Sequence, residues 1–458
     1  MNDNNGTAGV HLKKSTPAAK NKKIDLSLIL RALRSRNYRL FFCGQIVSLL
    51  GSWMTQIATA WLVWSLTGSP LMLGIVGFAG QIPAFLLSPV AGVFVDRWPR
   101  HRLLVITQSL AMVQSFMLAF LALAGIINIW QIMVLMVFQG LINAFDMPAR
   151  QAFVIEMVEN KEDLSNAIAL NSSMFNAART VGPAVAGLIL AVGGAGWCFL
   201  IDGISYIGVI VCLLMMVVPK FEKKERENPW KQLSEGYQYA VGFPPIRAFL
   251  LLVAGISLIG MPYSVLMPVV ATKVLHGAEG TFSLLVVFSG MGALTGALVL
   301  AARASVRGLT RVIPYCTLGF GLGLIIFSHS HWLWLSLLTM FLMGYTLMTQ
   351  NASSNTILQT IVDPDKRGRV MSFYMMAFMG MMPLGSLWSG AVADRIGAQN
   401  TLLICGVGCL ALAAWFTRSL PKLAEHIRPI YKEMGIIPEV AMGMENTSEL
   451  TRPPERVG

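Results

Sequence analysis

Twelve apolar runs, each long enough to cross a lipid bilayer as a helix, dominate this sequence. They lie at 40–66, 72–95, 103–124, 129–148, 167–192, 197–219, 248–272, 281–302, 309–328, 331–350, 370–392 and 400–418. About 20 residues of helix span the roughly 30 Å hydrocarbon layer. Only 13% of the residues are charged and the mean hydropathy is +0.62, whereas soluble domains carry about 25% charged residues. The sequence therefore predicts an all-α integral membrane protein with twelve transmembrane helices.

Basic residues fall on one side of the predicted membrane. The N-terminal segment and the loops after the even-numbered runs carry them repeatedly, whereas the other loops hold only Lys273 and Arg395. By the positive-inside rule, we expect both termini in the cytoplasm. The same bias accounts for the net charge of +12 without a nucleic-acid partner. No cleavable signal peptide is evident before the first run near Leu40, and we expect a multi-pass protein of the bacterial cytoplasmic (inner) membrane.

Two weakly similar halves flank the longest internal polar segment. Pro183 falls on Pro383 at a shift of 200 residues, and Gly92 falls on Gly296 at a shift of 204. Parallel repeats of six helices are the arrangement of the major facilitator superfamily, which the sequence resembles. We therefore expect a basic cytoplasmic N-terminal segment at 1–39, a six-helix bundle at 40–219, a cytoplasmic linker at 220–247, a second six-helix bundle at 248–418 and a cytoplasmic tail at 419–458.

The loop after the second run, GVFVDRWPRHR (92–102), combines a glycine, an aspartate and basic residues. It resembles the signature loop between helices 2 and 3 of the superfamily. A glycine allows close helix approach, and an aspartate at a helix end needs a donor or a cation. Such a cluster can act as a conformational latch that forms and breaks during alternating access; the alternative is a basic loop facing anionic lipids. The latch residues are Gly92, Asp96, Arg97, Arg100 and Arg102.

A second Asp-Arg pair, Asp394-Arg395, follows the eleventh run and is expected on the opposite side of the membrane from Asp96. The counterpart of the first loop in the second half is GALVLAARASVR (296–307), where Leu300 takes the place of the aspartate. The sequence therefore predicts an asymmetric gate and assigns no specific role to Asp394.

A glycine–proline motif lies within the fifth run, in ARTVGPAVAG (178–187). It resembles the helix 5 motif of exporters in the superfamily. Together with WLVWSLTGS (61–69), DMPARQAF (146–153) and a resemblance over nearly the whole apolar chain, this motif makes the sequence most similar to the branch of siderophore (enterobactin) and macrolide exporters. This resemblance implies export, with Arg179, Gly182, Pro183 and Gly187 as motif residues. The alternative is an ordinary proline kink in a packed bundle.

Few ionisable residues lie within the runs, where a charge is costly and a functional role is the default interpretation. We interpret Asp202 as a protonatable switch, Asp146 as a second candidate for coupling, and Arg179 as a conformational or anion-contacting residue. The alternative for each is a buried structural charge. We do not expect Arg179 and Asp202 to pair, because their depths differ by roughly 10 Å at 1.5 Å per helical residue.

The substrate cavity of this superfamily is lined mainly by helices 1, 4, 7 and 10. A polar stripe on one helix face is unfavourable in lipid and should face protein or water, although Ser and Thr often only join neighbouring helices. Few charges together with many Met, Trp and Phe residues favour a bulky amphipathic or aromatic substrate. The candidate cavity residues are Gln45, Ser52, Gln56, Gln139, Asn143, Met261, Tyr263, Met343 and Thr346.

Other functional classes lack their motifs. The chain has no HExxH, no GxSxG and no Gly-Lys dipeptide, so zincin, serine-hydrolase and P-loop chemistry are not indicated. We expect no enzyme activity, no cofactor and no metal site; His329 and His331 lack a third ligand. The sequence predicts a monomeric secondary transporter that exports a small molecule, with protons as the coupling ion. A lipid or lysophospholipid flippase of the same fold is the alternative, followed by an intramembrane enzyme or a receptor.

Overall fold

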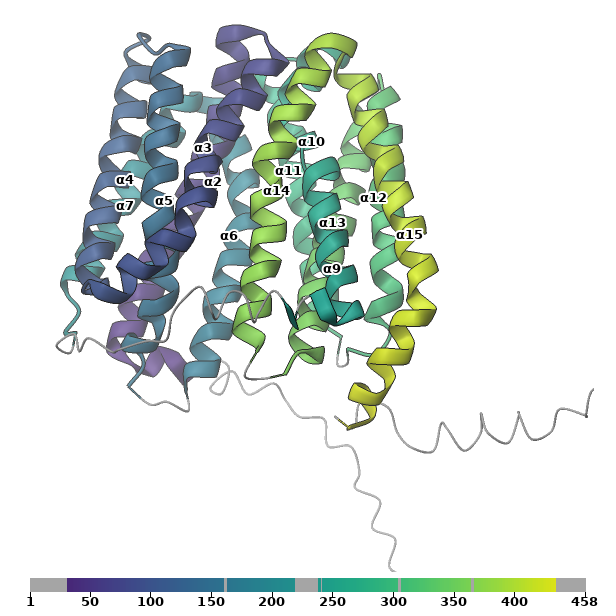
Figure 1. Ribbon diagram of the computed structural model, residues 1–458. Coiled ribbons are helices and arrows are strands. Elements are labelled where there is room, and N and C mark those ends of the chain that lie inside the picture. Colours follow the sequence, from purple (N-terminus) through teal and green to yellow (C-terminus); the bar gives the residue numbers. More distant parts are fainter. Residues whose placement is uncertain are drawn as a thin grey trace, which may run out of the picture.

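A computed structural model describes residues 31–159, 163–218, 238–239, 241–303, 306–363 and 366–433. Within these ranges twelve helices are long and apolar enough to cross a membrane, and no strand is present. This confirms the predicted all-α architecture of twelve membrane helices. The described ends of the chain, η1 (Arg31–Arg34) and the end of α15, lie at the same end of the bundle, at the bottom of Figure 1. We call this the terminal end and the opposite one the far end.

The first six spans form one half of the molecule. They are α2 (Arg36–Thr67), α3 (Pro70–Arg97), α4 (Arg100–Leu123), α5 (Ile129–Met157), α6 (Leu164–Gly193) and α7 (Ala195–Leu214). The second half comprises a composite seventh span followed by α11 (Glu279–Ala301), α12 (Leu309–His329), α13 (Leu333–Ile361), α14 (Arg367–Ile396) and α15 (Ala398–Glu433).

Local signals fix the turn between α2 and α3 at the far end. Gly68 ends α2 in the left-handed conformation (φ 60°), which favours glycine. Ser69 then caps α3, its side chain accepting a hydrogen bond from the backbone N–H of Met72, and Pro70 occupies the first helical turn. This tight turn holds Ser69 at the N-terminus of α3, next to the second half.

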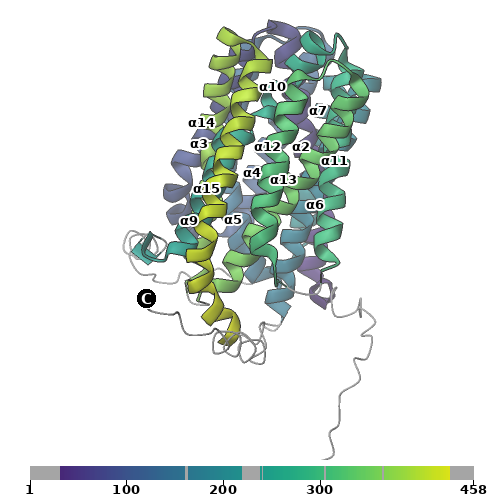
Figure 2. The same cartoon turned by 90° about the vertical axis from the view of Figure 1, so that its right-hand side faces the viewer.

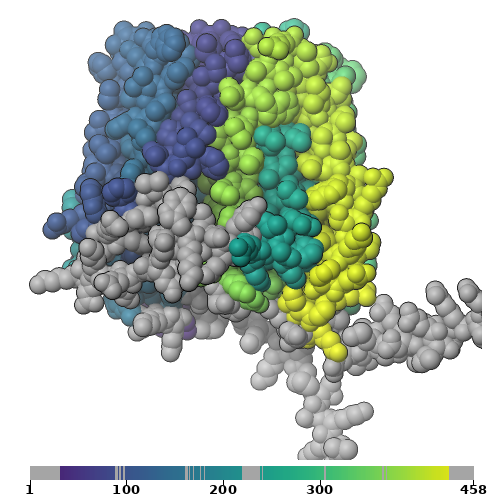
Figure 3. Space-filling view, viewed as in Figure 1, coloured from purple at the N-terminus to yellow at the C-terminus, as the bar shows by residue number. Residues whose placement is uncertain are grey.

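The halves contact each other through two helix pairs, α3 with α14 and α6 with α11. The two pairs lie on opposite sides of the bundle in Figure 2, and the space-filling view shows the halves in contact along the upper part of the molecule (Figure 3). Glycines permit this approach: a Cβ on Gly74 would lie 2.5 Å from the carbonyl oxygen of Ser386, and a Cβ on Gly390 would lie 2.7 Å from that of Pro70.

The seventh span is a composite of four segments: α9 (Pro244–Gly255), the π-helical turn η3 (Ile256–Gly260), α10 (Tyr263–Val269) and a second π-helical turn η4 (Val270–Val274). Pro262 and Pro268 lack the N–H that a continuous helix needs. The Met261 amide instead donates to the Ile256 carbonyl, five residues back, at 2.9 Å. Single π-helical turns of this kind occur frequently at functional sites.

The last helix continues beyond the expected end of the twelfth run at residue 418 and reaches Glu433. Leu423, Ile427 and Tyr431 on this extension are buried, and they belong to the same apolar cluster as Phe249 and Phe416. Their spacing of four residues forms one helix face. The polar composition of the tail concealed this buried stripe, so the first part of the predicted tail is a packed helix.

Candidate functional site

The apolar core is continuous at the far end and divided at the terminal end. One cluster of buried residues joins the halves at the far end, including Val63 of α2, Leu190 of α6 and Phe282 of α11. Towards the terminal end the core separates into one cluster within the first half and another within the second. In Figure 1, α3 and α14 accordingly lie side by side near the top and diverge towards the bottom.

Aromatic residues of α2 bind the seventh and eighth spans across the far end. The indole N–H of Trp64 donates to Thr272 Oγ1 at 2.9 Å, and the Lys273 ammonium lies 5.3 Å from the centre of the Trp64 ring. One turn earlier, Trp61 stacks on Phe282 with ring centres 5.3 Å apart. Cation–π and stacking contacts each favour association beyond simple burial. We call these five residues the far-end clasp.

Asp394 adds a polar contact between the halves beside this clasp. Its carboxylate, on α14, accepts a hydrogen bond from the Ser69 hydroxyl at 3.3 Å. Ser69 is the N-cap of α3, so the negative charge lies at the positive end of that helix dipole. The aspartate to which the sequence assigned no role therefore bridges the halves.

The two glycines of the helix 5 motif provide space on opposite sides of α6. A Cβ on Gly182 would lie 2.5 Å from Trp53 Cβ on α2, within the same half. A Cβ on Gly187 would lie 2.7 Å from the Ser283 carbonyl oxygen on α11, in the other half. Pro183 lies inside α6, and the helix continues to Gly193. The motif therefore packs α6 between its own half and the opposite one.

Arg179 lies near the middle of α6 and contacts the second half. Its guanidinium donates to the Met348 sulfur at 3.2 Å and lies 5.5 Å from the centre of the Phe378 ring. Within the described part of the chain, no carboxylate lies within salt-bridge distance of it, and it does not pair with Asp202. This cation is held at the interface by a thioether and an aromatic ring.

Asp202 of α7 is only 1% exposed and connects three helices of the first half. Its Oδ2 accepts hydrogen bonds from Thr55 of α2 at 2.7 Å and from Ser115 of α4 at 2.8 Å. Its Oδ1 has no hydrogen-bond partner and faces Gly51, where a Cβ would lie 2.5 Å away. Among the described residues no lysine, arginine or histidine forms an ion pair with this carboxylate.

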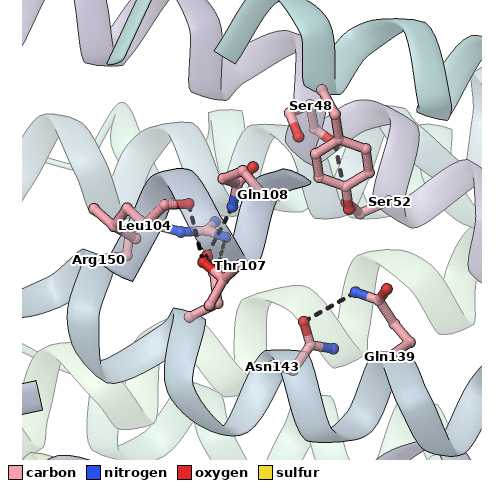
Figure 4. A network of polar contacts seen from close by, with 10 residues as sticks. Ser48, Ser52, Leu104, Thr107, Gln108, Gln139, Asn143 and Arg150 are labelled. Atoms are coloured by element: carbon pink, nitrogen blue, oxygen red, sulfur yellow. Dashed lines mark hydrogen bonds and ion pairs between the residues drawn. The ribbon is translucent and has the colours of Figure 1, made fainter. Parts of the chain in front are cut away.

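Asp146 of α5 is 2% exposed, and both of its oxygens are engaged. Oδ1 accepts hydrogen bonds from Thr107 at 2.8 Å and Gln108 at 2.7 Å, while Oδ2 pairs with Arg150 one turn further along α5. Figure 4 shows Thr107, Gln108 and Arg150 converging on one point. This arrangement compensates the buried charge.

The polar candidates for the cavity in the first half differ in their hydrogen-bond partners and in their burial. Gln139 and Asn143 lie together on α5, with a hydrogen bond of 3.2 Å between their side chains (Figure 4), and Gln139 Oε1 has no partner. Ser52 instead bonds to Tyr206 of α7 at 3.1 Å, inside the first half. Gln45 is buried and Gln56 is exposed.

The candidates in the second half differ in orientation. Tyr263 follows the break in the seventh span, lies 3.3 Å from Ser289 by its hydroxyl, and is preceded by the partly buried Met261. Met343 and Thr346 pack against α12, since Cβ atoms on Gly323 and Gly319 would meet them at 2.6 and 3.1 Å. These two therefore contact α12 within the second half, and their role in the cavity stays a prediction.

Gly92 and the side chains of Asp96 and Arg97 lie outside the described part of the structure, so the latch stays a prediction. Of its other members, Arg100 forms an ion pair with Glu156 of α5 and Arg102 is exposed. Sequence reasoning did not single out Met348, Phe378 or the far-end clasp. A signal for the clasp existed, because Trp61 and Trp64 are three residues apart and Lys273 was an exception to the charge bias.

Comparisons with known proteins agree with this architecture. The family model of transmembrane secretion effectors matches residues 29–447. The staphyloferrin A transporter of Staphylococcus aureus is 30% identical over 391 residues, which cover 84% of this chain and 96% of that protein. Macrolide efflux protein A of Streptococcus pyogenes is 23% identical, over 84% of this chain and 98% of that protein.

A solved structure supports the fold alone. It is that of a bacterial homologue of the human lysosomal transporter Spinster in an inward-facing, unoccupied conformation, with a TM-score of 0.65 and 13% identity over 86% of this chain and 98% of that one. Together with the match of the family model over most of the chain, these likenesses agree with the resemblance inferred from the motifs. The chain belongs to the transmembrane secretion effector family of the major facilitator superfamily.

Proposed function

We propose that the protein is a secondary active exporter of a bulky amphipathic or aromatic small molecule, such as a siderophore or a drug, that works by alternating access with protons as the coupling ion. The interface between the halves carries this proposal: the halves share a core at the far end and have separate cores at the terminal end. Two rigid halves that close at one end and separate at the other are what alternating access requires.

The direction of opening follows from the charge bias of the loops. The positive-inside rule puts the terminal end in the cytoplasm, so this conformation is open to the inside. The names of two relatives, a staphyloferrin A transporter and a macrolide efflux protein, support small-molecule export as the activity. A multi-pass location in the cytoplasmic membrane and a monomeric state belong to the same proposal.

Proton coupling is assigned to Asp202. A buried carboxylate with no cation beside it carries an uncompensated charge, and taking up a proton removes that charge. Asp202 meets this description, since only one of its oxygens has hydrogen-bond partners. Its partners come from α2 and α4, so a change in its protonation acts on the packing of α7 against both helices.

The test is accumulation of a compound panel in cells with and without the protein, each with and without a protonophore. We expect the protein to lower the accumulation of at least one amphipathic or aromatic compound, and the protonophore to abolish this difference. Lipid translocation by the purified protein in vesicles, with no effect on any soluble compound, would contradict the proposal and favour the flippase. Efflux that persists with the protonophore would remove the proton-coupling part.

A further inference from the structure

We infer that Arg179 is the anion-binding subsite of the transport pathway, and that the exported molecule is an organic anion whose carboxylate or similar acidic group adjoins an aromatic ring. This inference rests on the proposed export function and adds the substrate class to it. It follows from what Arg179 contacts and from what the structure leaves without a partner.

The guanidinium of Arg179 has more N–H donors than the described structure provides with hydrogen-bond acceptors. Arginine offers five N–H donors in a planar fork that matches a carboxylate. In the described structure its guanidinium donates one hydrogen bond, to the Met348 sulfur, which is a weak acceptor, and its other contact is the face of the Phe378 ring. No aspartate or glutamate in the described ranges lies within salt-bridge distance of it.

The two buried carboxylates within the described parts of the membrane spans, Asp146 and Asp202, form no ion pair with Arg179. Asp146 is neutralised by Arg150, and Asp202 takes its hydrogen bonds from two hydroxyl groups of its own half. A cation at mid-depth in a membrane protein without an anion beside it is costly, and a cation–π contact offsets only part of that cost. Arg179 is thus a positive charge at mid-depth that the acidic group of a ligand can neutralise.

The groups around Arg179 determine the shape of that ligand. Tyr374 and Phe378 are four residues apart on α14, and Tyr263 of α10 is a third aromatic group near the arginine. The Tyr374 hydroxyl donates to the Asn351 carbonyl at 3.1 Å and the Tyr263 hydroxyl lies 3.3 Å from Ser289. Both hydroxyl groups are thus engaged away from the arginine, and the ring face that contacts it is that of Phe378.

The location of Arg179 gives a ligand access. The residue is partly exposed although it lies near the middle of a membrane span. It faces α13 and α14 of the opposite half rather than lipid, through Met348 and Phe378. The interface is divided towards the terminal end, so an anion entering from that end meets the arginine with aromatic rings of both α10 and α14 nearby. Rearrangement of the halves would then break the Met348 and Phe378 contacts.

The experiment measures binding of radiolabelled 2-naphthoate to the purified full-length protein, with unlabelled 2-naphthoate and its neutral amide, 2-naphthamide, as competitors. We expect wild type to bind the carboxylate at least about tenfold more tightly than the amide, the effect of one charge-assisted contact. Arg179→Met should remove this preference while changing the affinity for the amide by less than about twofold. Arg179→Lys should retain part of it, because the charge remains but the planar fork is lost.

Arg428→Met is the matched control, because it removes an exposed arginine on the α15 extension and should leave the preference unchanged. Equal binding of both compounds by wild type, no binding of the carboxylate, or an unchanged preference in Arg179→Met would each overturn the inference. Arg179→Lys serves the same purpose if Arg179→Met does not fold.

The inference and the export function can fail separately. If cells export neutral and anionic compounds equally well and Arg179→Lys changes neither, export stands and the anion subsite is wrong. If the purified protein shows an Arg179-dependent preference for 2-naphthoate but lowers the accumulation of no compound, the subsite stands and the exporter proposal is wrong.

Discussion

Two buried carboxylates in the first half differ in whether a cation lies beside them. Asp146 and Asp202 are 2% and 1% exposed, and each accepts two side-chain hydrogen bonds of 2.7–2.8 Å on one oxygen. The second oxygen of Asp146 pairs with Arg150, whereas the second oxygen of Asp202 has no partner. A charge with a permanent counter-ion is stable as it is, while a charge without one gains by taking up a proton. The sequence nominated both for coupling; the surroundings favour Asp202.

The largest expected effect comes from neutralising the acid that lacks a cation. Asp202→Asn keeps the size and the oxygen that accepts from Thr55 and Ser115, so the protein should insert normally. We expect proton-driven efflux to fall to the level of cells without the protein, measured as compound accumulation with and without a protonophore. Asp146→Asn is the control and should retain protonophore-sensitive efflux. Normal efflux by Asp202→Asn would break the comparison.

The second prediction makes Asp146 resemble Asp202. Arg150→Met removes the counter-ion and leaves a buried carboxylate unpaired, which should cost about 3 kcal/mol of unfolding free energy. Thermal unfolding of the purified protein measures this loss. The double variant Arg150→Met/Asp146→Asn should recover most of it, because the uncompensated charge is gone. Full stability of the single variant would show that Asp146 does not depend on Arg150.

A third acid extends the comparison to the predicted latch. Asp96→Asn should lower the rate of efflux by roughly fivefold or more, the lower end of typical coupling free energies between conformations. The amount of inserted protein should stay the same, because the substitution preserves shape. Quantified membrane protein and initial efflux rates test this together. An unchanged rate would exclude Asp96 as a latch and leave the lipid-facing basic loop.

The smallest effect on the efflux rate is expected at Asp394, an acid whose side chain is exposed. Asp394→Ala removes the hydrogen bond from Ser69 and the interaction with the dipole of α3, which should change the efflux rate by at most about fivefold. Because Ser69→Ala removes the same bond, the double variant should be no worse than the more affected single variant. Additive effects would show that the two residues act independently.

Hydropathy was enough to predict twelve helices, and the weak repeat together with the resemblance of the motifs at 92–102 and 178–187 predicted their family. They could not predict which side chains of a helix face which neighbour, because successive residues of an α-helix are 100° apart around its axis. Met343 and Thr346 were predicted from the sequence and contact α12, whereas Met348, two residues beyond Thr346, contacts Arg179 and was not predicted. Likewise the partners of Asp202 lie 147 and 87 residues away in sequence, so no local pattern indicated them.

The glycines between the halves suggest a way to capture the opposite conformation. A side chain on Gly74 or Gly187 would meet the backbone carbonyl of Ser386 or Ser283, which cannot move aside as a side chain can. A bulky residue there would act as a wedge that opens the far end without touching Asp202 or Arg179. Under the proposed alternating-access mechanism, Gly74→Leu or Gly187→Leu should favour a form that is open at the far end, which structure determination or conformation-selective antibodies could then exploit.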